Sequence, residues 1–172
     1  RGADVAEFPK LRYEPLSAAA PIPEEIEALS EYRWVLFTSP AGVDSFWDLL
    51  ARRVEDSRAL GGVLVAGLGK ATIDALRKRG IVPEVRARTY DPTAVIRELN
   101  SHGPVAGARI LFPRERNAPS AIAAELRWIG ARVDEIETFN VSLELGDPDE
   151  ASGRIAPELI VLPSSTAATL LA

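Results

Sequence analysis

Short apolar runs alternate with segments of helical periodicity along most of this chain, and this alternation is the feature that most restricts its fold. The apolar runs lie at residues 34–37, 63–65, 109–112 and 159–162. They contain no alternating polar residues, which is typical of strands buried on both faces of a sheet. Because a helical segment follows each run, the pattern favours an α/β fold with a largely parallel sheet.

The segments that follow the runs begin with signals for the start of a helix. Ser39 and Asp91 each stand immediately before a proline, the order expected for an N-cap and the first helical position. Ser120 is a further candidate N-cap.

Two stretches lack the alternation of strands and helices: residues 13–23 are rich in Pro, Ala and Ser, and residues 140–157 are polar with interspersed Gly and Pro. We expect both stretches to be crossings or surface loops.

An internal similarity suggests that the chain contains a duplicated unit. Residues 2–8 resemble residues 130–136, and residues 36–41 have a looser echo in residues 161–166. The two echoes occur in the same order and at nearly the same spacing, which favours a repeated α/β unit. One copy has all its elements, whereas the other lacks elements at both ends. We therefore expect one complete domain and one incomplete domain.

Composition excludes several classes of function. The chain has no cysteine, which rules out disulfides, cysteine-ligated metals and thiol nucleophiles. Its one histidine, His102, lies in a predicted turn without partners at ligand spacing, so neither a metal site nor a Ser-His-Asp triad is expected. A net charge of −5 with scattered basic residues argues against nucleic-acid binding. No apolar run is long enough to cross a membrane.

Candidate binding residues follow the ends of the predicted strands. The relevant segments are residues 38–40, 67–72, 113–117 and 163–166, which contain hydroxyls, glycines and a few cations. The carboxyl ends of parallel strands meet at one edge of a sheet, and the helix starts beside them attract anions. Taken singly, Ser39, Thr72 and Ser164 are explained as helix caps. Together, the four segments could line a cleft that binds carboxylates or phosphates.

The glycine turn at residues 67–70 does not satisfy either common nucleotide-binding pattern. A P-loop would have glycine in place of Leu64 and a hydroxyl residue in place of Ala71. A dinucleotide fingerprint would have its third glycine where Thr72 stands. A nucleotide site is therefore disfavoured.

Six short motifs in this chain resemble those of the uroporphyrinogen-III synthase family. In chain order they are residues 2–5, 36–40, 65–72, 111–114, 126–133 and 160–165. The resemblance implies two flavodoxin-like or Rossmann-like parallel-sheet domains, joined by two crossing segments, with a cleft between them. On this chain it implies that residues 1–16 and 138–172 belong to an incomplete first domain and the return crossing. Residues 17–137 would then form the complete second domain.

The same resemblance implies an activity. The family cyclises hydroxymethylbilane, with loss of water and inversion of the last pyrrole ring, to give uroporphyrinogen III. This is a cofactor-independent lyase step of heme and cobalamin biosynthesis, and no metal is expected. The partner would be the tetrapyrrole substrate, with no nucleic acid or membrane. A cytoplasmic monomer is expected, either alone or fused to another enzyme of the pathway.

By family position, Thr72 matches a hydroxyl of the catalytic cleft, and Ser39 and Ser164 match substrate-binding hydroxyls. Gly69, Lys70 and Arg114 also align with substrate-binding positions, with the two cations as contacts for substrate carboxylates. Phe139 departs from the family pattern, because a tyrosine proposed to assist the leaving hydroxyl commonly stands there.

Three explanations of Phe139 stay open: the acid lies elsewhere, the alignment is shifted by a few residues, or water serves as the acid.

The alternative function is a non-catalytic α/β module that binds a small anionic ligand at the strand ends. A nucleotide- or sugar-phosphate-binding enzyme is a third, weaker hypothesis.

Overall fold

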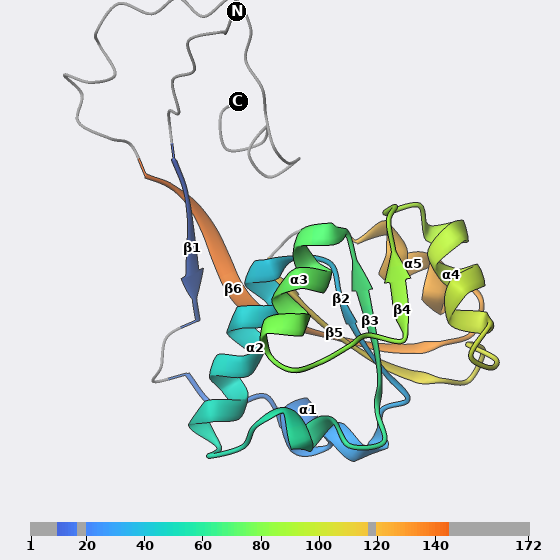
Figure 1. The fold of residues 1–172 in the computed structure, drawn as a ribbon, viewed down its shortest axis with the longest axis horizontal. Helices are drawn as coiled ribbons and strands as arrows, with labels where there is room; N and C mark the ends of the chain where they lie inside the picture. Colours follow the sequence, from blue (N-terminus) through green and yellow to red (C-terminus); the bar gives the residue numbers. More distant parts are fainter. Residues whose placement is uncertain (1–9, 17–19, 117–119, 145–172) are drawn as a thin grey trace, which may run out of the picture. The chain divides into compact units, whose positions relative to one another are not determined.

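A computed structural model describes residues 10–16, 20–116 and 120–144 of the chain (Figure 1). The strands in this part are β1 (Lys10–Pro15), β2 (Trp34–Phe37), β3 (Leu64–Leu68), β4 (Val85–Ala87), β5 (Arg109–Glu115) and β6 (Arg132–Glu144). The helices are α1 (Glu24–Glu27), α2 (Pro40–Arg52), α3 (Lys70–Lys78), α4 (Pro92–Asn100) and α5 (Ala121–Trp128), with 3-10 turns η1 (Leu29–Glu31) and η2 (Ser57–Leu60). None of the helices in this part is long and apolar enough to cross a membrane.

The chain divides into two compact units. Pro15–Phe139 form one unit, and the described residues 10–14 and 140–144 belong to the other. In this second unit, β1 lies beside the last part of β6. The domain boundaries expected from the sequence stay a prediction, because most of the expected first domain lies outside the described residues.

The unit Pro15–Phe139 contains a parallel sheet in the order β6-β5-β2-β3-β4. Followed from β4 to β6 and counted within this unit, the strands are arranged third, second, first, fourth, fifth, which is the Rossmann order. The direction of chain progression reverses between β2 and β5, where Trp34 pairs with Ile110. The predicted α/β fold with a parallel sheet is confirmed, and the strand order identifies this unit as the Rossmann-like variant.

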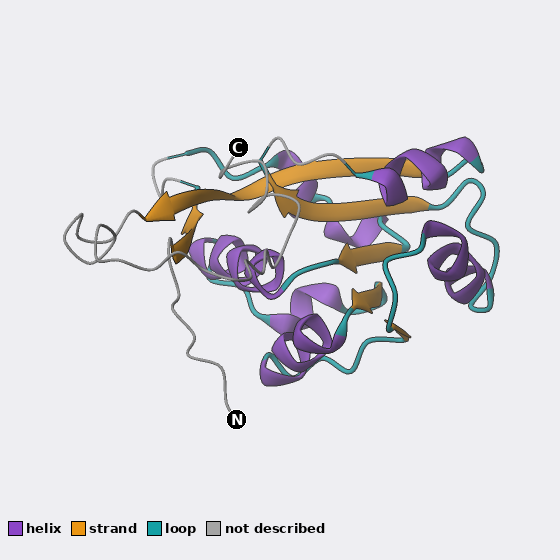
Figure 2. Cartoon of the chain, turned by 90° about the horizontal axis from the view of Figure 1, so that it is seen from above, coloured by secondary structure: helices purple, strands orange, loops and turns teal. Residues whose placement is uncertain are grey.

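Helices cover both faces of this sheet (Figure 2). Along β2, Trp34 and Leu36 belong to the cluster that includes α4 and α5, whereas Val35 and Phe37 belong to the cluster that includes α2 and α3. All four side chains are 0% exposed. Burial on both faces explains why the strand is a continuous apolar run.

The predicted helix starts at residues 39, 91 and 120 are confirmed. The side chains of Ser39, Asp91 and Ser120 accept hydrogen bonds from the amides of Gly42, Ala94 and Ala123, at 3.0, 3.1 and 3.1 Å respectively. Each cap satisfies one of the amides that an α-helix leaves without an internal partner.

The two proposed crossings include or adjoin the points where the chain passes from one unit to the other, but their described ends are not loops. Their described ends form parts of paired strands, β1 and β6, and β6 continues to Glu144. Strand β6 pairs with β5, and Leu16 donates to the carbonyl of Thr138 at 3.2 Å. This pairing satisfies backbone groups that a loop would leave to water. The internal echoes and the expected elements at residues 159–172 lie wholly or partly outside the described residues.

Candidate functional site

The carboxyl edge of the parallel sheet gathers most of the residues predicted to bind a ligand. Here we use "carboxyl edge" for the ends of β2, β3, β4 and β5 and the turns that follow them. Ser39 follows β2, Gly69, Lys70 and Thr72 follow β3, and Arg114 lies near the end of β5. The reversal between β2 and β5 makes this edge the expected ligand position of an open α/β sheet. Ser164 lies outside the described residues.

The turn after β2 packs closely against the end of β5. A Cβ atom on Gly42 would lie 3.2 Å from Oγ of Ser39 and 3.4 Å from the carbonyl oxygen of Pro113. A larger residue would therefore push the start of α2 away from β5. Glycine at this position brings the half-buried Ser39 to the point where the strand order reverses.

The turn after β3 leaves polar groups without partners inside the protein. Gly69 caps α3 with φ of 80°, a conformation that favours glycine, and offers no side-chain cap to the helix. Thr72 is 0% exposed, and its Oγ1 has no hydrogen-bond partner. Buried hydroxyls without partners are rare in folded proteins. The start of α3 therefore combines a helix cap without a side chain and a buried hydroxyl without a partner, and the predicted ligand-binding role of Gly69 and Thr72 stays a prediction.

Lys70 is the exposed cation at this helix start. Its Nζ lies 2.5 Å from Oδ2 of Asp74, and its side chain is 90% exposed. The hydrogen bond from Lys70 holds the pKa of the Asp74 carboxyl below its ordinary value. An exposed ion pair of this kind contributes little to stability, so Lys70 can turn to a ligand carboxylate at low cost.

Arg114 differs from Lys70 because its charge is already matched inside the protein. It forms an ion pair with Glu135, and both side chains are only 17% exposed. Arg127 of α5 also binds Glu135, at 2.7 Å. A ligand carboxylate would have to compete with Glu135 for this guanidinium. The predicted role of Arg114 in substrate binding stays a prediction.

A bulge in β6 gives the segment around Phe139 an irregular register. Arg114 pairs with Glu137, but Glu115 pairs with Phe139, so Thr138 is an extra residue on β6. A bulge redirects the side chains beside it. Phe139 is 4% exposed, and its Cε1 would lie 3.8 Å from a Cβ atom on Gly42. The aromatic ring is thus packed against the start of α2.

Two hydroxyl groups beside this segment, those of Ser45 and Thr138, are satisfied by protein atoms. Ser45 of α2 donates to Oγ1 of Thr138 at 2.8 Å, and Thr138 donates weakly to the carbonyl of Arg114 at 3.4 Å. Thr138 is 3% exposed. This pair therefore ties β6 to α2, in contrast to the unpartnered hydroxyl of Thr72.

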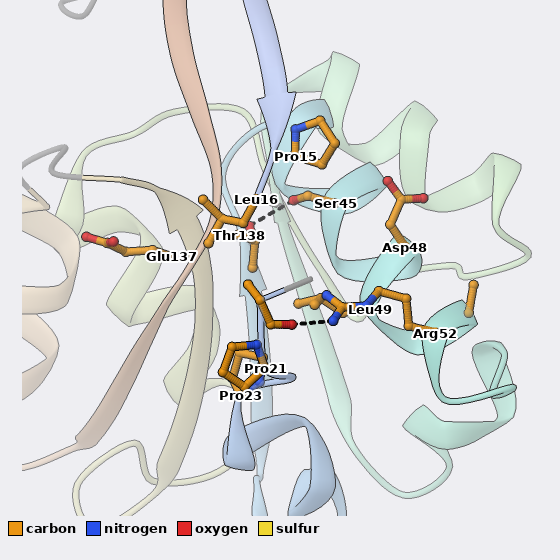
Figure 3. Close-up of a pocket in the computed structure, with 12 residues that line it drawn as sticks. Pro15, Leu16, Pro21, Pro23, Ser45, Asp48, Leu49, Arg52, Glu137 and Thr138 are labelled. Atoms are coloured by element: carbon orange, nitrogen blue, oxygen red, sulfur yellow. Dashed lines mark hydrogen bonds between the residues drawn. The ribbon is translucent and has the colours of Figure 1, made fainter. Parts of the chain in front are cut away.

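A cavity of about 370 Å³ lies between α2 and the chain segment that leads to β2 (Figure 3). Its lining includes Pro15, Leu16, Pro21, Pro23, Leu49 and Thr138. Figure 3 shows Ser45 and Thr138 pointing toward each other at its wall. None of the predicted site residues in the described part lines this cavity. Its mostly apolar wall is unsuited to a ligand with many carboxylates.

Tyr90 is a residue of the carboxyl edge that no sequence motif singled out. It lies in the loop after β4, and its hydroxyl is 3.2 Å from the carbonyl oxygen of Thr38 and 3.4 Å from that of Leu68. A Cβ atom on Gly69 would lie only 2.6 Å from this hydroxyl. The absence of a side chain on Gly69 therefore lets Tyr90 reach across β3 to the end of β2.

A connected polar network lies at the opposite edge of the sheet, where the parallel strands begin. We call this the "amino edge". Tyr32 donates to Oδ2 of Asp134 at 2.7 Å, and Nε of Arg109 donates to the same oxygen at 2.9 Å. The guanidinium carbon of Arg109 lies 4.4 Å from the centre of the Tyr32 ring. Burial, followed by the bond to Asp134, raises the pKa of Tyr32. Burial also opposes ionisation of Asp134, but the bonds from Tyr32 and Arg109 outweigh it and lower the pKa of that carboxyl.

The described residues include no group of three or more His, Cys, Asp or Glu side chains that could hold a metal ion.

A family profile described as "Uroporphyrinogen-III synthase HemD" matches residues 1–171. The chain belongs to the uroporphyrinogen-III synthase family. The family expected from the sequence motifs is therefore confirmed.

Two curated relatives of this synthase-family chain agree with the profile. It is 30% identical over 153 residues to the uroporphyrinogen-III synthase of Synechococcus elongatus, a match covering 87% of this chain and 56% of the relative. It is 28% identical over 90 residues to the porphyrin biosynthesis protein HemD of Ruminiclostridium josui, covering 52% of this chain and 18% of that protein. The chain thus spans little more than half the length of the first relative.

Solved structures support the same fold. A mutant uroporphyrinogen III synthase from Thermus thermophilus matches with a TM-score of 0.57 and 18% identity, covering 80% of this chain and 53% of that one. The synthetase of Helicobacter pylori matches with a TM-score of 0.50 and 12% identity, covering 83% and 58% respectively. At these identities the likeness establishes the fold alone.

Proposed function

We propose that this protein acts as a uroporphyrinogen-III synthase, a lyase that cyclises hydroxymethylbilane with loss of water and inversion of the last pyrrole ring. The proposal rests on membership of the family and on the polar groups at the start of α3. The observation that carries it is the start of α3, where the Gly69 cap has no side chain and Lys70 is exposed, beside the buried and unpartnered Thr72 hydroxyl. Such a site is suited to a ligand that brings its own hydrogen-bonding groups.

Binding of the substrate carboxylates is assigned to the helix starts at the carboxyl edge. The amides at the start of α3 and the positive end of its dipole favour an anion. Lys70 adds a mobile positive charge at the same helix start. With a net charge of −5, the protein does not attract a polyanion over long distances, so attraction has to be local.

The chemical step then depends mainly on positioning. Departure of the substrate hydroxyl leaves an electrophilic carbon, and the substituted carbon of the last ring attacks it to form a spiro intermediate. Thr72 and Ser39 would orient the substrate by hydrogen bonds, and holding the reacting carbons together lowers the barrier. Phe139 has no proton to give to the leaving hydroxyl, so this position does not supply the acid.

The proposal includes the setting in which the protein works. We expect a cytoplasmic monomer without metal or organic cofactor, acting alone or fused to another enzyme of tetrapyrrole biosynthesis. The alternative, a non-catalytic module that binds a small anion at the strand ends, uses the same architecture, since a fold does not fix a function.

The decisive experiment supplies the native full-length protein with enzymatically made hydroxymethylbilane and separates the product isomers. We expect uroporphyrinogen III to predominate. Formation of only the type I isomer, which arises without catalysis, would contradict the proposal. Binding of the bilane without turnover would instead support the non-catalytic module, and micromolar affinity for a nucleotide would support the phosphate-binding alternative.

A further inference from the structure

The Tyr90 hydroxyl belongs to a cluster of three oxygen atoms at the carboxyl edge. The other two are the carbonyl oxygens of Thr38 and Leu68, at 3.2 and 3.4 Å from it. Both distances exceed the usual separation of about 2.7–2.8 Å for such bonds. The phenol has one proton, which is shared between two acceptors, while its own lone pairs are left to accept a further bond.

This cluster is chemically opposite to the neighbouring start of α3. The helix start presents amides and Lys70, which are hydrogen-bond donors, whereas the cluster presents oxygen acceptors. The carboxylate of Asp91, the next residue along the chain, adds a further negative group and caps α4 through Ala94. A substrate carboxylate is therefore favoured at the helix start and disfavoured at the cluster, where a neutral donor is needed.

Tyr90 is accessible to a ligand and held in a defined position. The residue is 55% exposed. Gly69 has no side chain, and any Cβ atom there would collide with the phenolic oxygen at 2.6 Å. The same glycine thus shapes the anion-binding helix start and admits the acceptor group beside it.

We propose that Tyr90 is a substrate-binding residue whose phenolic oxygen accepts a hydrogen bond from a pyrrole N–H of the tetrapyrrole. This inference rests on the proposed function, because it takes the substrate class from it. Each pyrrole ring carries both carboxylate substituents and a ring N–H. Donor groups at α3 and an acceptor at Tyr90 therefore match two different parts of one ring and fix its orientation.

The test compares two small probes: a monopyrrole with acetate and propionate substituents, and the furan with the same substituents. The furan has an oxygen in place of the N–H, so it cannot donate to Tyr90. We expect the native protein to bind the pyrrole about fivefold more tightly than the furan in an NMR titration, the effect of one hydrogen bond. In Tyr90→Phe the ratio should fall to about one, because the acceptor is gone while the ring remains.

Ser101→Ala is the matched control. It also deletes a hydroxyl that donates to a backbone carbonyl, that of Glu98 at 2.6 Å, but it follows α4 at the amino edge. Its pyrrole-to-furan ratio should equal that of the native protein. A native ratio near one, or a preference that survives in Tyr90→Phe, overturns the proposal.

A kinetic measurement covers the case in which the small probes bind too weakly to compare. In the full-length protein, Tyr90→Phe should raise the KM for hydroxymethylbilane about fivefold while kcat stays nearly constant. An unchanged KM overturns the role of Tyr90. If the native protein makes only the type I isomer, the proposed function fails instead, and the probe ratio still decides whether Tyr90 accepts an N–H.

Discussion

The two edges of the parallel sheet treat their polar side chains in opposite ways. At the amino edge, Tyr32 and Arg109 share the carboxylate of Asp134, so each donor has a charged acceptor. At the carboxyl edge, the hydroxyl of Thr72 is buried without a partner, and Tyr90 makes only long bonds. The Tyr32, Arg109 and Asp134 side chains satisfy one another, whereas the Thr72 hydroxyl has no partner among the described residues.

Because of this difference, we expect the two edges to contribute differently to the stability of the protein and to substrate binding. A satisfied network contributes to the free energy of unfolding, whereas an unpaired buried hydroxyl costs about 1–3 kcal/mol. Substitutions at the amino edge should therefore lower stability and leave the reaction intact. Substitutions at the carboxyl edge should impair the reaction with little loss, or even a gain, of stability.

Asp134→Asn should give the largest loss of stability among these tests. The substitution removes the charge with which Arg109 and Tyr32 both interact. A hydrogen bond to a charged group contributes about 1.5–3 kcal/mol to stability. We expect urea denaturation to show a loss of about 2 kcal/mol in the free energy of unfolding. The isomer ratio of the product should not change, because Asp134 lies at the amino edge.

Asp44→Asn is the control, since Asp44 and Arg79 form an exposed pair at 3.0 Å whose loss should cost less than about 0.5 kcal/mol. Acid provides a second check. The pKa of Asp134 is lower in the folded protein than its ordinary value of 3.8, so its stabilisation is present above that value. It is lost as the pH falls through the folded-state pKa, and the difference between native protein and Asp134→Asn should shrink there. A constant difference would contradict the role of the ionised carboxylate.

Thr72→Val should have a smaller effect on stability, with the opposite sign. Replacing an unpartnered buried hydroxyl by a methyl group removes a desolvation cost, so we expect a gain of about 1 kcal/mol in the free energy of unfolding. Formation of uroporphyrinogen III should fall at least about tenfold, because the hydroxyl is assigned to the substrate.

Thr138→Val distinguishes this prediction from a general effect of removing buried hydroxyls. Thr138 is also buried, but it accepts a bond from Ser45 at 2.8 Å. Its replacement should therefore cost about 1 kcal/mol. If both valine variants lose stability to the same extent, Thr72 has a partner inside the protein and the contrast between the edges does not hold.

The features decided by neighbouring residues were predictable from the sequence. Ser39, Asp91 and Ser120 cap their helices because each side chain bonds to an amide only three residues ahead. Strand β2 could be located because burial on both faces demands an unbroken apolar run. The order of strands and helices then placed Ser39 and the glycine turn at one edge.

Features that depend on contacts between distant segments were not predictable. Tyr90 reaches Thr38 only because β3 and β2 are adjacent in the sheet and Gly69 leaves room. Arg114 looked available for a ligand, but the neighbouring strand β6 brings Glu135 to it. The bulge at Thr138 is a matter of register, which a single sequence does not reveal.

Lys70→Gln should change stability least while still affecting binding. The pair with Asp74 is exposed, so its loss should alter the free energy of unfolding by less than about 0.5 kcal/mol. The KM for hydroxymethylbilane should rise about threefold, because an exposed cation contributes a modest attraction to a carboxylate. Lys78→Gln, at the other end of α3, removes the same charge far from the helix start and should leave KM unchanged. Equal effects of the two variants would mean that net charge matters and that the α3 start has no special part in holding the substrate.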